Sequence, residues 1–378
     1  MSGRPRWVDL RDTSGVALRE WLARAPEEAI DPDQAIIDSH HHLWDWLPRF
    51  ELPEETPSKT EAGAQYGYSA LPLRYLGDDL MDDVRGGGHN VINTVFIECM
   101  TMYRADGGNM ACVGETEFAN GIAAIADSNL YGSDVRCCGA IVGFADLTLG
   151  AAVEPILWAH QAASSRFRGI RHAYAWHQSP DIGNAQHPPE DNQGLLARED
   201  FRAGFAVLDR LGLTFDCWGY HTQLEDLEDL ARAFPNTTLV VDHIGGPIAK
   251  GPLAGERDGK VFLEWQRGVR SLAACANVVI KLGGCGMPAY GWGYSERDAP
   301  PTSTEMATAW QPYFAALIEA FGVERCMFES NFPIDKVSCS YTNLWNAYKR
   351  ITTALKLSAT EKDELFFGCA ARVYEIGK

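Results

Sequence analysis

Three consecutive histidines, His40, His41 and His42, stand between an apolar run and a pair of tryptophans in the stretch IIDSHHHLWDW. Alternate side chains of a β-strand share one face. We therefore expect His40 and His42 to lie on one face with Asp38, and His41 to face the surrounding helices. Two neutral imidazoles on one face can approach a common metal ion such as Zn²⁺. We predict that His40 and His42 bind a divalent metal; the competing interpretation is a pair of hydrogen-bonded core histidines.

Other residues able to move protons end or follow predicted strands. His172 lies in GIRHAY, His221 in WGYHTQ and His243 in VVDHIGG. Glu98 and Glu329 end two more strands, in FIECM and MFESN. Imidazoles and carboxylates are the usual general acids and bases, and a metal ion beside them lowers the pKa of bound water. We predict that these five residues are catalytic, together with Asn331 in ESNFP.

The elements that must position these residues follow a regular alternation from residue 35 onward. Short β-branched segments predict strands at residues 35–40, 91–98, 136–145, 168–173, 213–218, 238–243, 277–282 and 325–330. Amphipathic segments predict helices near residues 74–86, 113–128, 150–164, 199–211, 222–233, 260–275, 305–321 and 341–357, with a ninth near 359–373. This alternation is typical of βα units with a parallel sheet. An open doubly wound sheet would carry a glycine-rich turn after its first strand, where HHHLWDW stands instead, so we predict an α/β fold of the (β/α)8 TIM-barrel type.

The domain organisation is expected to be simple. No repeat or low-complexity linker divides the chain, so residues 35–378 are predicted to form a single barrel domain. Residues 1–34 are expected to be an N-terminal extension with a short helix, GVALREWLARA, packed outside the barrel. Two long segments, residues 43–73 and 283–304, follow predicted strands and therefore belong to the barrel face that carries active sites, so we expect them to be binding loops.

Several residues near strand ends could bind a substrate. Arg171 precedes His172, and strand alternation lets only one of the two face the barrel mouth. Arg104, after the second predicted strand, is a second candidate for gripping a substrate carboxylate, with a solvated surface arginine as the alternative. Four aromatic residues are predicted to line an apolar pocket for a ring substrate. They are Tyr103, Trp176, Tyr220 and Trp292.

Composition excludes some classes of partner. A formal net charge of -18 opposes binding to nucleic acid or to anionic membranes, and no apolar run approaches the ~18 residues of a membrane span. The ten cysteines form no CxxC pair, and the N-terminus lacks the apolar core of a secretory signal. We expect a cytoplasmic protein with a small-molecule substrate, and the sequence leaves open whether it is a monomer or a homo-oligomer.

Six motifs spread over the predicted barrel carry a family resemblance. They are DSHHHLW (38–44), VGFADLT (142–148), FRGIRHAY (167–174), FPNTTLVVDHIGGP (234–247), VVIKLGG (278–284) and ERCMFESNFPID (324–335). In this order they resemble the amidohydrolase-2 group of the amidohydrolase superfamily, which includes sugar lactonases and 2-pyrone-4,6-dicarboxylate lactonase. The resemblance implies a TIM-barrel hydrolase with a divalent metal, most often zinc, although it allows metal-free catalysis for some lactonases.

The last motif departs from the family pattern. The resemblance implies G-S-D-W-P at the end of the eighth strand, with its aspartate as metal ligand or base, whereas this chain has Asn331 there. An amide cannot accept a proton at neutral pH and is a weaker ligand than a carboxylate. We therefore expect weaker metal binding and expect Glu98 or Glu329 to supply the missing carboxylate. The alternative is that both glutamates are buried partners of Arg171 or Lys281.

The resulting hypothesis is a hydrolase of a cyclic ester, a lactone, whose carbonyl is held at the barrel mouth. The resemblance also allows a second enzymatic class, a decarboxylase or another lyase. The third alternative is a binding protein that has lost catalysis, which Asn331 favours and the retained histidines oppose.

Overall fold

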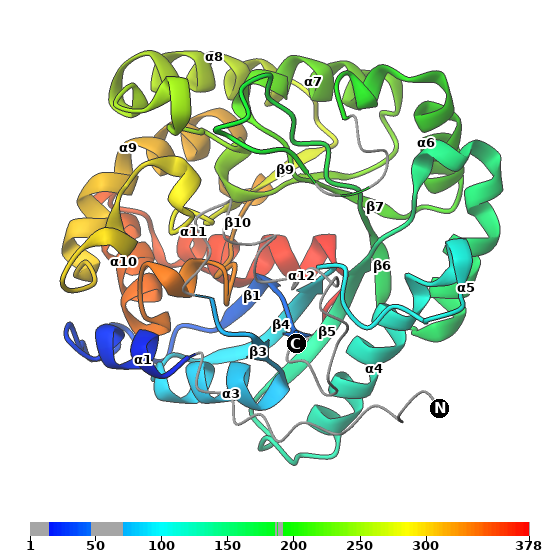
Figure 1. The fold of residues 1–378 in the computed structure, drawn as a ribbon. Coiled ribbons are helices and arrows are strands. Elements are labelled where there is room, and N and C mark those ends of the chain that lie inside the picture. The colour runs from blue at the N-terminus through cyan, green and yellow to red at the C-terminus, as the bar shows by residue number, and fades with distance from the viewer. Residues whose placement is uncertain (1–14, 47–70, 186, 188–191, 378) are drawn as a thin grey trace, which may run out of the picture.

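Eight parallel strands form one sheet, and helices surround it (Figure 1). The computed structural model describes residues 15–46, 71–185, 187 and 192–377. In sheet order the strands are β1 (Ile36–His41), β4 (Val91–Ile97), β5 (Arg136–Gly143), β6 (Phe167–Arg171), β7 (Thr214–Cys217), β8 (Leu239–Val241), β9 (Val278–Leu282) and β10 (Cys326–Phe328). All eight predicted strands are therefore present, each within or close to its expected range.

The sheet closes on itself just beyond β10. The N–H of Asn331 donates to the carbonyl of His40 (2.9 Å), and the N–H of His42 donates to the carbonyl of Phe332 (2.8 Å). His41 and Phe332 form an isolated parallel bridge. These contacts join the last strand to the first, so the predicted (β/α)8 TIM barrel is confirmed.

Amphipathic helices cover the outside of the barrel. They are α3 (Gly77–Gly86), α4 (Val113–Asp127), α5 (Glu154–Ala163), α6 (Glu199–Arg210), α7 (Leu224–Ala233), α8 (Phe262–Leu272), α9 (Ser303–Phe321) and α10 (Tyr341–Ala354). The helix predicted at 359–373 is interrupted: a π-helical turn, Glu364–Gly368, separates α11 (Ala359–Asp363) from α12 (Cys369–Val373). None of the helices in the described part of the chain is long and apolar enough to cross a bilayer.

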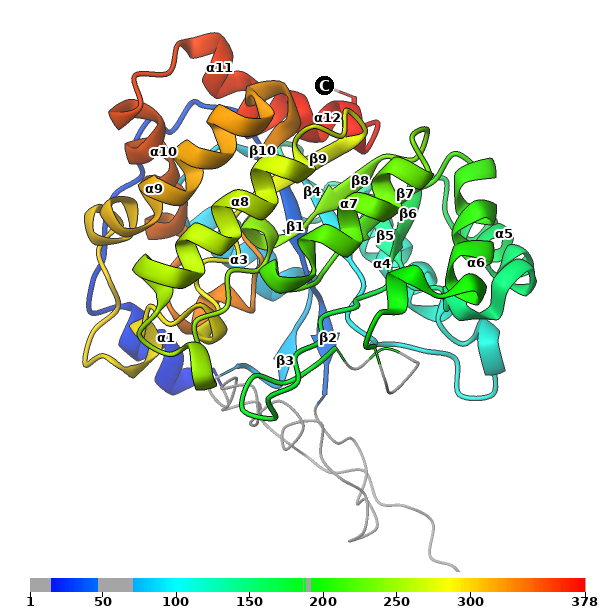
Figure 2. The same cartoon turned by 90° about the horizontal axis from the view of Figure 1, so that it is seen from above.

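The described parts of the two predicted loops lie with helix α1 at one end of the barrel. After β1 the chain forms a small antiparallel pair, β2 (Trp44–Asp45) with β3 (Arg74–Tyr75), while residues 47–70 lie outside the described residues. Helix α1 (Val16–Leu22) lies near this pair, and α11 and α12 lie at the opposite end (Figure 2). Trp21 Nε1 donates to the carbonyl of Arg297 (2.8 Å), so α1 holds the loop at residues 283–304 in place.

The interior of the barrel has its own apolar core. One apolar cluster lies between the sheet and the surrounding helices. Alternate strand residues that point into the barrel form a second, separate cluster, which side chains from the C-terminal segment complete. The cluster consists of Ile37, Val95, Ile97, Ala140, Val142, Val240, Val279 and Met327 from the strands, with Phe367, Cys369, Ala370, Tyr374 and Ile376 from the C-terminal segment. The C-terminal segment is therefore the floor of the barrel.

Tyr374 connects this floor to the charged layer above it. Its ring is fully buried, and its hydroxyl donates to Oδ2 of Asp216 in β7 (2.7 Å). We predict that Tyr374→Phe lowers the free energy of unfolding by roughly 1–3 kcal/mol, because a buried hydrogen bond to a carboxylate is lost. Denaturant unfolding measures the change. Tyr131→Phe is the matched control, since the Tyr131 hydroxyl donates to the exposed Asp78 (3.0 Å) and its loss should cost less than about 1 kcal/mol. Equal losses in the two variants would contradict this role of Tyr374.

Candidate active site

Charged and imidazole side chains from the strands and strand ends converge above the apolar interior. They are His40 in β1, Glu98 after β4, Arg171 in β6, Asp216 in β7, Asp242 and His243 after β8, Lys281 in β9 and Glu329 after β10. Arg171, His42 and His243 keep 7%, 4% and 3% of their surface exposed, whereas Lys281, Asp216 and Glu329 are at 0%. All of these residues are buried; the first three lie nearest the surface, and the ionic layer lies deeper.

His40 and His42 face each other as the sequence predicted. Their Nε2 atoms are 3.1 Å apart, and Nδ1 of His42 donates to the carbonyl of Ile97 (2.8 Å). That bond leaves the Nε2 lone pair of His42 directed at His40. Burial lowers the pKa of His42 to about 3 and that of His40 well below its usual range, so both imidazoles are neutral at pH 7.

The prediction that Asp38 shares a face with His40 and His42 is wrong. The pairing of β1 with β4 slips between Asp38 and His41, and this irregularity breaks the alternation of side chains. Asp38 accepts hydrogen bonds from the N–H of Ser330 (2.8 Å) and from the hydroxyl of Tyr341 in α10 (2.9 Å), so it lies on the helix side. His41 does face the helix side as predicted.

Arg171, and not His172, reaches the lumen. Arg171 Nε donates to Oε1 of Glu98 (2.6 Å) and Nη2 to the Glu98 carbonyl (2.6 Å), while His187 Nε2 lies 2.9 Å from Oε2 of Glu98. Burial alone would raise the pKa of Glu98, but His187 and Arg171 together lower it to about 2. Glu98 is thus an ionised partner of Arg171, the alternative that the sequence had left open.

Lys281 occupies the centre of the ionic layer. Its Nζ lies 2.6 Å from Oδ2 of Asp216, 3.0 Å from Oδ1 of Asp242 and 3.2 Å from Nδ1 of His40. Burial opposes the charge of Lys281, yet Asp216 and Asp242 outweigh it and raise the pKa of the ammonium. The same ion pairs hold the pKa of Asp242 well below its usual range despite burial.

Glu329 connects two histidines. Its Oε1 accepts from Nδ1 of His243 (2.7 Å) and from the His243 N–H (3.1 Å), and its Oε2 lies 3.0 Å from Nδ1 of His40. Because His243 gives its Nδ1 proton to this bond, its Nε2 keeps the lone pair. Gly284 makes room for the ring, since a Cβ at that position would come within 2.5 Å of His243.

Several predicted site residues lie away from this cluster. His172 packs against Phe144 and Phe201, with ring centroids at 5.3 and 5.5 Å, and His221 Nδ1 lies 3.3 Å from the carbonyl of Gly246. Arg104 pairs with Glu117 at the surface (2.5 Å), as a solvated arginine would.

The predicted aromatic residues are spread over the loops. Tyr220 stacks edge-on with Trp218 at 5.9 Å, and Trp218 stacks edge-on with His243 at 5.0 Å. Gln223 Oε1 accepts from the N–H groups of Trp176 and Tyr220 and so ties these two loops together. The two remaining aromatic residues, Tyr103 and Trp292, are partly buried and pack against the apolar cluster between the sheet and the helices.

The amide of Asn331 faces a carboxyl group. Its Nδ2 donates to Oδ1 of Asp335 (2.8 Å), and the Gly286 N–H donates to Oδ2 of Asp335 (2.7 Å). Burial raises the pKa of Asp335 well above its usual range. The position that the family resemblance assigns to an aspartate is thus filled by a hydrogen-bonded amide.

Four residues near these side chains were not predicted as site residues, although Lys281 was named as an alternative partner of the buried glutamates: His187, Asp216, Asp242 and Lys281. The last three stand in otherwise apolar strand segments, TFDC, VVDH and VVIKL, and a charged residue in a buried strand is the signal that could have identified them. His187 comes from the loop after β6 and has no periodic neighbours that would place it.

Comparisons with known proteins identify the family and agree with the barrel fold. A family model described as Amidohydrolase matches residues 37–376. The uncharacterized protein y4mH of Sinorhizobium fredii is 32% identical over 91% of this chain and 99% of its own length. The L-fucono-1,5-lactonase of Burkholderia multivorans is 25% identical over 90% of this chain and 96% of its own length. The solved structure of a Burkholderia multivorans amidohydrolase with bound Zn covers 91% of this chain and 100% of its own, with 22% identity and a TM-score of 0.62.

A second buried acid supports the loop after Glu98. Oε1 of Glu115 accepts from the N–H groups of Cys99 (2.8 Å) and Thr101 (3.1 Å). Burial, reinforced by the charge of Glu98, raises the pKa of Glu115 to about 8. Glu115 is therefore protonated at neutral pH.

This shift predicts a pH dependence of stability. The folded state holds the Glu115 proton above the pKa of about 4.3 of the unfolded chain, so the stabilisation is complete below that pH and is lost as pH rises through about 8. We expect the free energy of unfolding of the wild type to fall relative to Glu115→Gln by at most about 1.4 kcal/mol per pH unit between these values. Urea unfolding at a series of pH values tests this. Parallel curves for the two proteins would contradict it.

Proposed function

The chain belongs to the amidohydrolase family, and we propose that it hydrolyses a cyclic ester, a lactone, at the end of the barrel lined by His42, Arg171 and His243. The observation that carries the proposal is the His243–Glu329 pair, a neutral imidazole fixed in one tautomer beside a guanidinium. The similarity of this chain to the L-fucono-1,5-lactonase supports this choice of substrate class.

In this proposal His243 is the general base. Burial lowers its pKa to about 3, so the imidazole is neutral over the physiological range. Oε1 of Glu329 accepts a hydrogen bond from the Nδ1–H of His243, and Nε2 remains able to accept a proton from water. Glu329 is a positioning residue in this scheme. Burial raises the pKa of Glu329 well above its usual range, so its role here is that of the hydrogen-bond acceptor that holds the His243 ring in place.

Arg171 is the proposed electrophilic group. Burial opposes its charge, but Glu98 and Asp242 outweigh that effect and raise its pKa, so it is a fixed cation. Its Nε and Nη2 are held by Glu98, which orients the remaining guanidinium edge. A preorganised cation of this kind stabilises the oxyanion that forms at a carbonyl under attack.

The reaction follows from these roles. Water gives a proton to Nε2 of His243 and its oxygen bonds to the lactone carbonyl carbon, while Arg171 stabilises the oxyanion. The tetrahedral adduct collapses, the ring C–O bond breaks, and the leaving alkoxide takes the proton back from His243. Lactone and water thus give a hydroxy acid, with no other reactant consumed.

A divalent metal ion, zinc in the first instance, would be held by His40 and His42. Ligands at ~2.1 Å on one ion are roughly 3.0–3.4 Å apart, and the two facing Nε2 atoms are 3.1 Å apart. Hydrogen bonding of His42 Nδ1 to a backbone carbonyl is the usual support for a metal-binding imidazole. When bound, such an ion would polarise the carbonyl or lower the pKa of a water molecule. Arg171 Nη1 lies 3.4 Å from Nε2 of His40 and competes for it, which weakens the site.

The hydrolytic proposal is tested with a panel of sugar lactones and substituted pyrones. We expect ring opening with one solvent oxygen in the product carboxylate. His243→Gln and Glu329→Gln should lower kcat/KM by roughly 10²–10⁴, the usual contribution of a general base. His89→Gln is the matched control, because His89 lies by Lys349 and Thr342 away from the cluster, and its activity should be retained. Release of CO₂ instead of solvent-oxygen incorporation would establish a decarboxylase, and binding without turnover would establish a binding protein.

The metal proposal has its own test. Asn331→Asp adds a carboxylate at the end of the last strand, and we expect it to raise the affinity for Zn²⁺ roughly tenfold or more, whereas His42→Ala should lower it. Competition against a chromophoric chelator measures both affinities. Equal affinity in the wild type and His42→Ala would exclude His42 as a ligand.

A further inference from the structure

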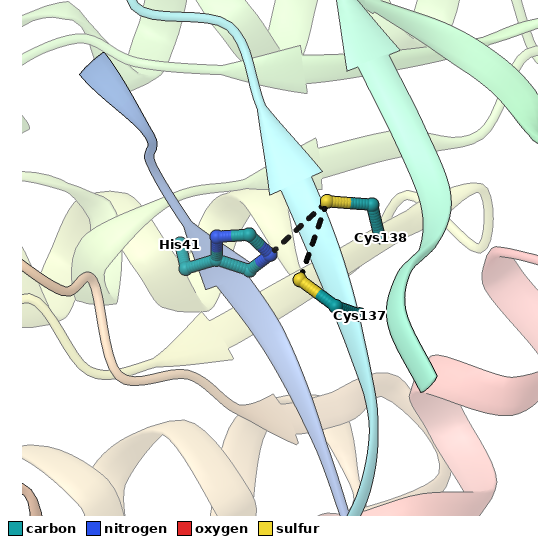
Figure 3. A group of neighbouring side chains, drawn as sticks. All are labelled: His41, Cys137 and Cys138. Carbon is teal, nitrogen blue, oxygen red and sulfur yellow. Dashed lines mark hydrogen bonds between the residues drawn. The ribbon is translucent and has the colours of Figure 1, made fainter. Parts of the chain in front are cut away.

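A second group of potential ligands lies outside the lumen, on the helix side of the sheet. His41, Cys137 and Cys138 bring one ring nitrogen and two sulphurs within 4.8 Å of one another (Figure 3). The two Sγ atoms are 3.6 Å apart, and Nε2 of His41 lies 3.9 Å from Sγ of Cys138. All three residues are buried, and the proposed lactone chemistry uses none of them.

The backbone is distorted in a way that creates this group. Neighbouring side chains of a regular strand point to opposite faces. Cys138 instead has φ +54°, in the left-handed region, and the pairing of β4 with β5 slips between Asn93 and Val95. This irregularity places both sulphurs on the same side, against the ring from β1. A left-handed backbone conformation costs free energy in a residue other than glycine, so contacts with the surrounding residues must stabilise it.

Polar atoms around the ring support a ligand role. Thr94 Oγ1 in β4 lies 2.9 Å from Nε2 of His41 and accepts the N–H of Cys138 (2.9 Å). Nδ1 of His41 is buried without a hydrogen-bond partner among the described residues. The donors thus comprise one nitrogen, two sulphurs and a nearby hydroxyl oxygen, from three adjacent strands.

We propose that His41, Cys137 and Cys138 bind one Zn²⁺ ion, with the Thr94 hydroxyl as the nearest fourth donor. Zinc takes tetrahedral sites of cysteine sulphur and histidine nitrogen, with ligand distances of ~2.3 and ~2.0 Å. Those values separate adjacent ligand atoms by roughly 3.5–3.8 Å, close to the 3.6 and 3.9 Å found. Binding replaces two thiol protons, which pass to solvent, and Zn²⁺ with two thiolates is neutral. Neutrality is what a site without water requires, and Cu⁺ would leave a buried negative charge.

The ion would cross-link the barrel wall. His41 is in β1 and the cysteines are in β5, the next strand but one, with β4 between them. His41 also stands between His40 and His42, so the proposed ion would fix the strand that carries those two residues from its opposite face.

The experiment uses full-length protein produced in zinc-supplemented medium and dialysed against EDTA, with zinc counted per chain. We expect one retained zinc in the wild type and in His42→Ala, and near none in Cys137→Ser/Cys138→Ser. Cys326→Ser, which removes a buried cysteine from β10, is the matched control and should keep the ion.

A thiolate-specific readout separates this site from the lumen. Protein produced with Cd²⁺ should show sulphur-to-metal charge-transfer absorption in the ultraviolet, and His42→Ala should show it equally. Wild-type protein without that absorption would overturn the proposal even if the cysteine variants fail to fold. So would absorption that persists in Cys137→Ser/Cys138→Ser. Preference for Cu⁺ over Zn²⁺ in competition would overturn the assignment of the ion.

Discussion

Mutual neutralisation of buried charges is the constraint on which the centre of this barrel depends. Four carboxyl groups, those of Glu98, Asp216, Asp242 and Glu329, share the lumen with the cations of Arg171 and Lys281, and burial raises the pKa of Asp216 and, well above its usual range, that of Glu329, so the four are not all ionised. An unpaired buried charge costs several kcal/mol, so each of these groups must keep its partner. Lys281 satisfies Asp216 and Asp242 at once, and Arg171 lies between Glu98 and Asp242. The network also fixes the position of the His40 ring, because Nδ1 of His40 contacts both the ammonium of Lys281 and the carboxyl group of Glu329.

The sequence contained most of the fold and part of the site. Strand positions followed from β-branched runs, and the inward direction of His40 and His42 followed from alternation. Asp38 could not be placed that way, because one irregularity in the pairing of β1 reverses its direction and no residue type announces it. His187 was equally hidden, since it reaches Glu98 from a long loop whose path depends on tertiary contacts. Which of Arg171 and His172 faces inward was decided by the register of β6.

Asn331 illustrates how a site can keep its architecture while one functional group changes. The amide makes a hydrogen bond to Asp335 and contributes its backbone N–H to closing the barrel through His40. The carboxyl group nearest to two imidazoles is instead Glu329, one pleat deeper in the same strand end. In the proposed lactonase reaction the proton-accepting atom therefore moves from the eighth strand to His243 after the sixth, without rearrangement of the sheet.

The floor formed by the C-terminal segment determines by which end of the barrel a small molecule could enter and leave. Phe367, Cys369, Ala370 and Tyr374 fill the lower end of the lumen, and Tyr374 seals it with a hydrogen bond to Asp216. In the described part of the chain these packed side chains close the lower end of the lumen, so a molecule bound beside Arg171 and His243 would enter and leave at the other end. In the proposed reaction, substrate would therefore enter and product would leave through the same opening, and product release would have to precede the binding of the next substrate molecule.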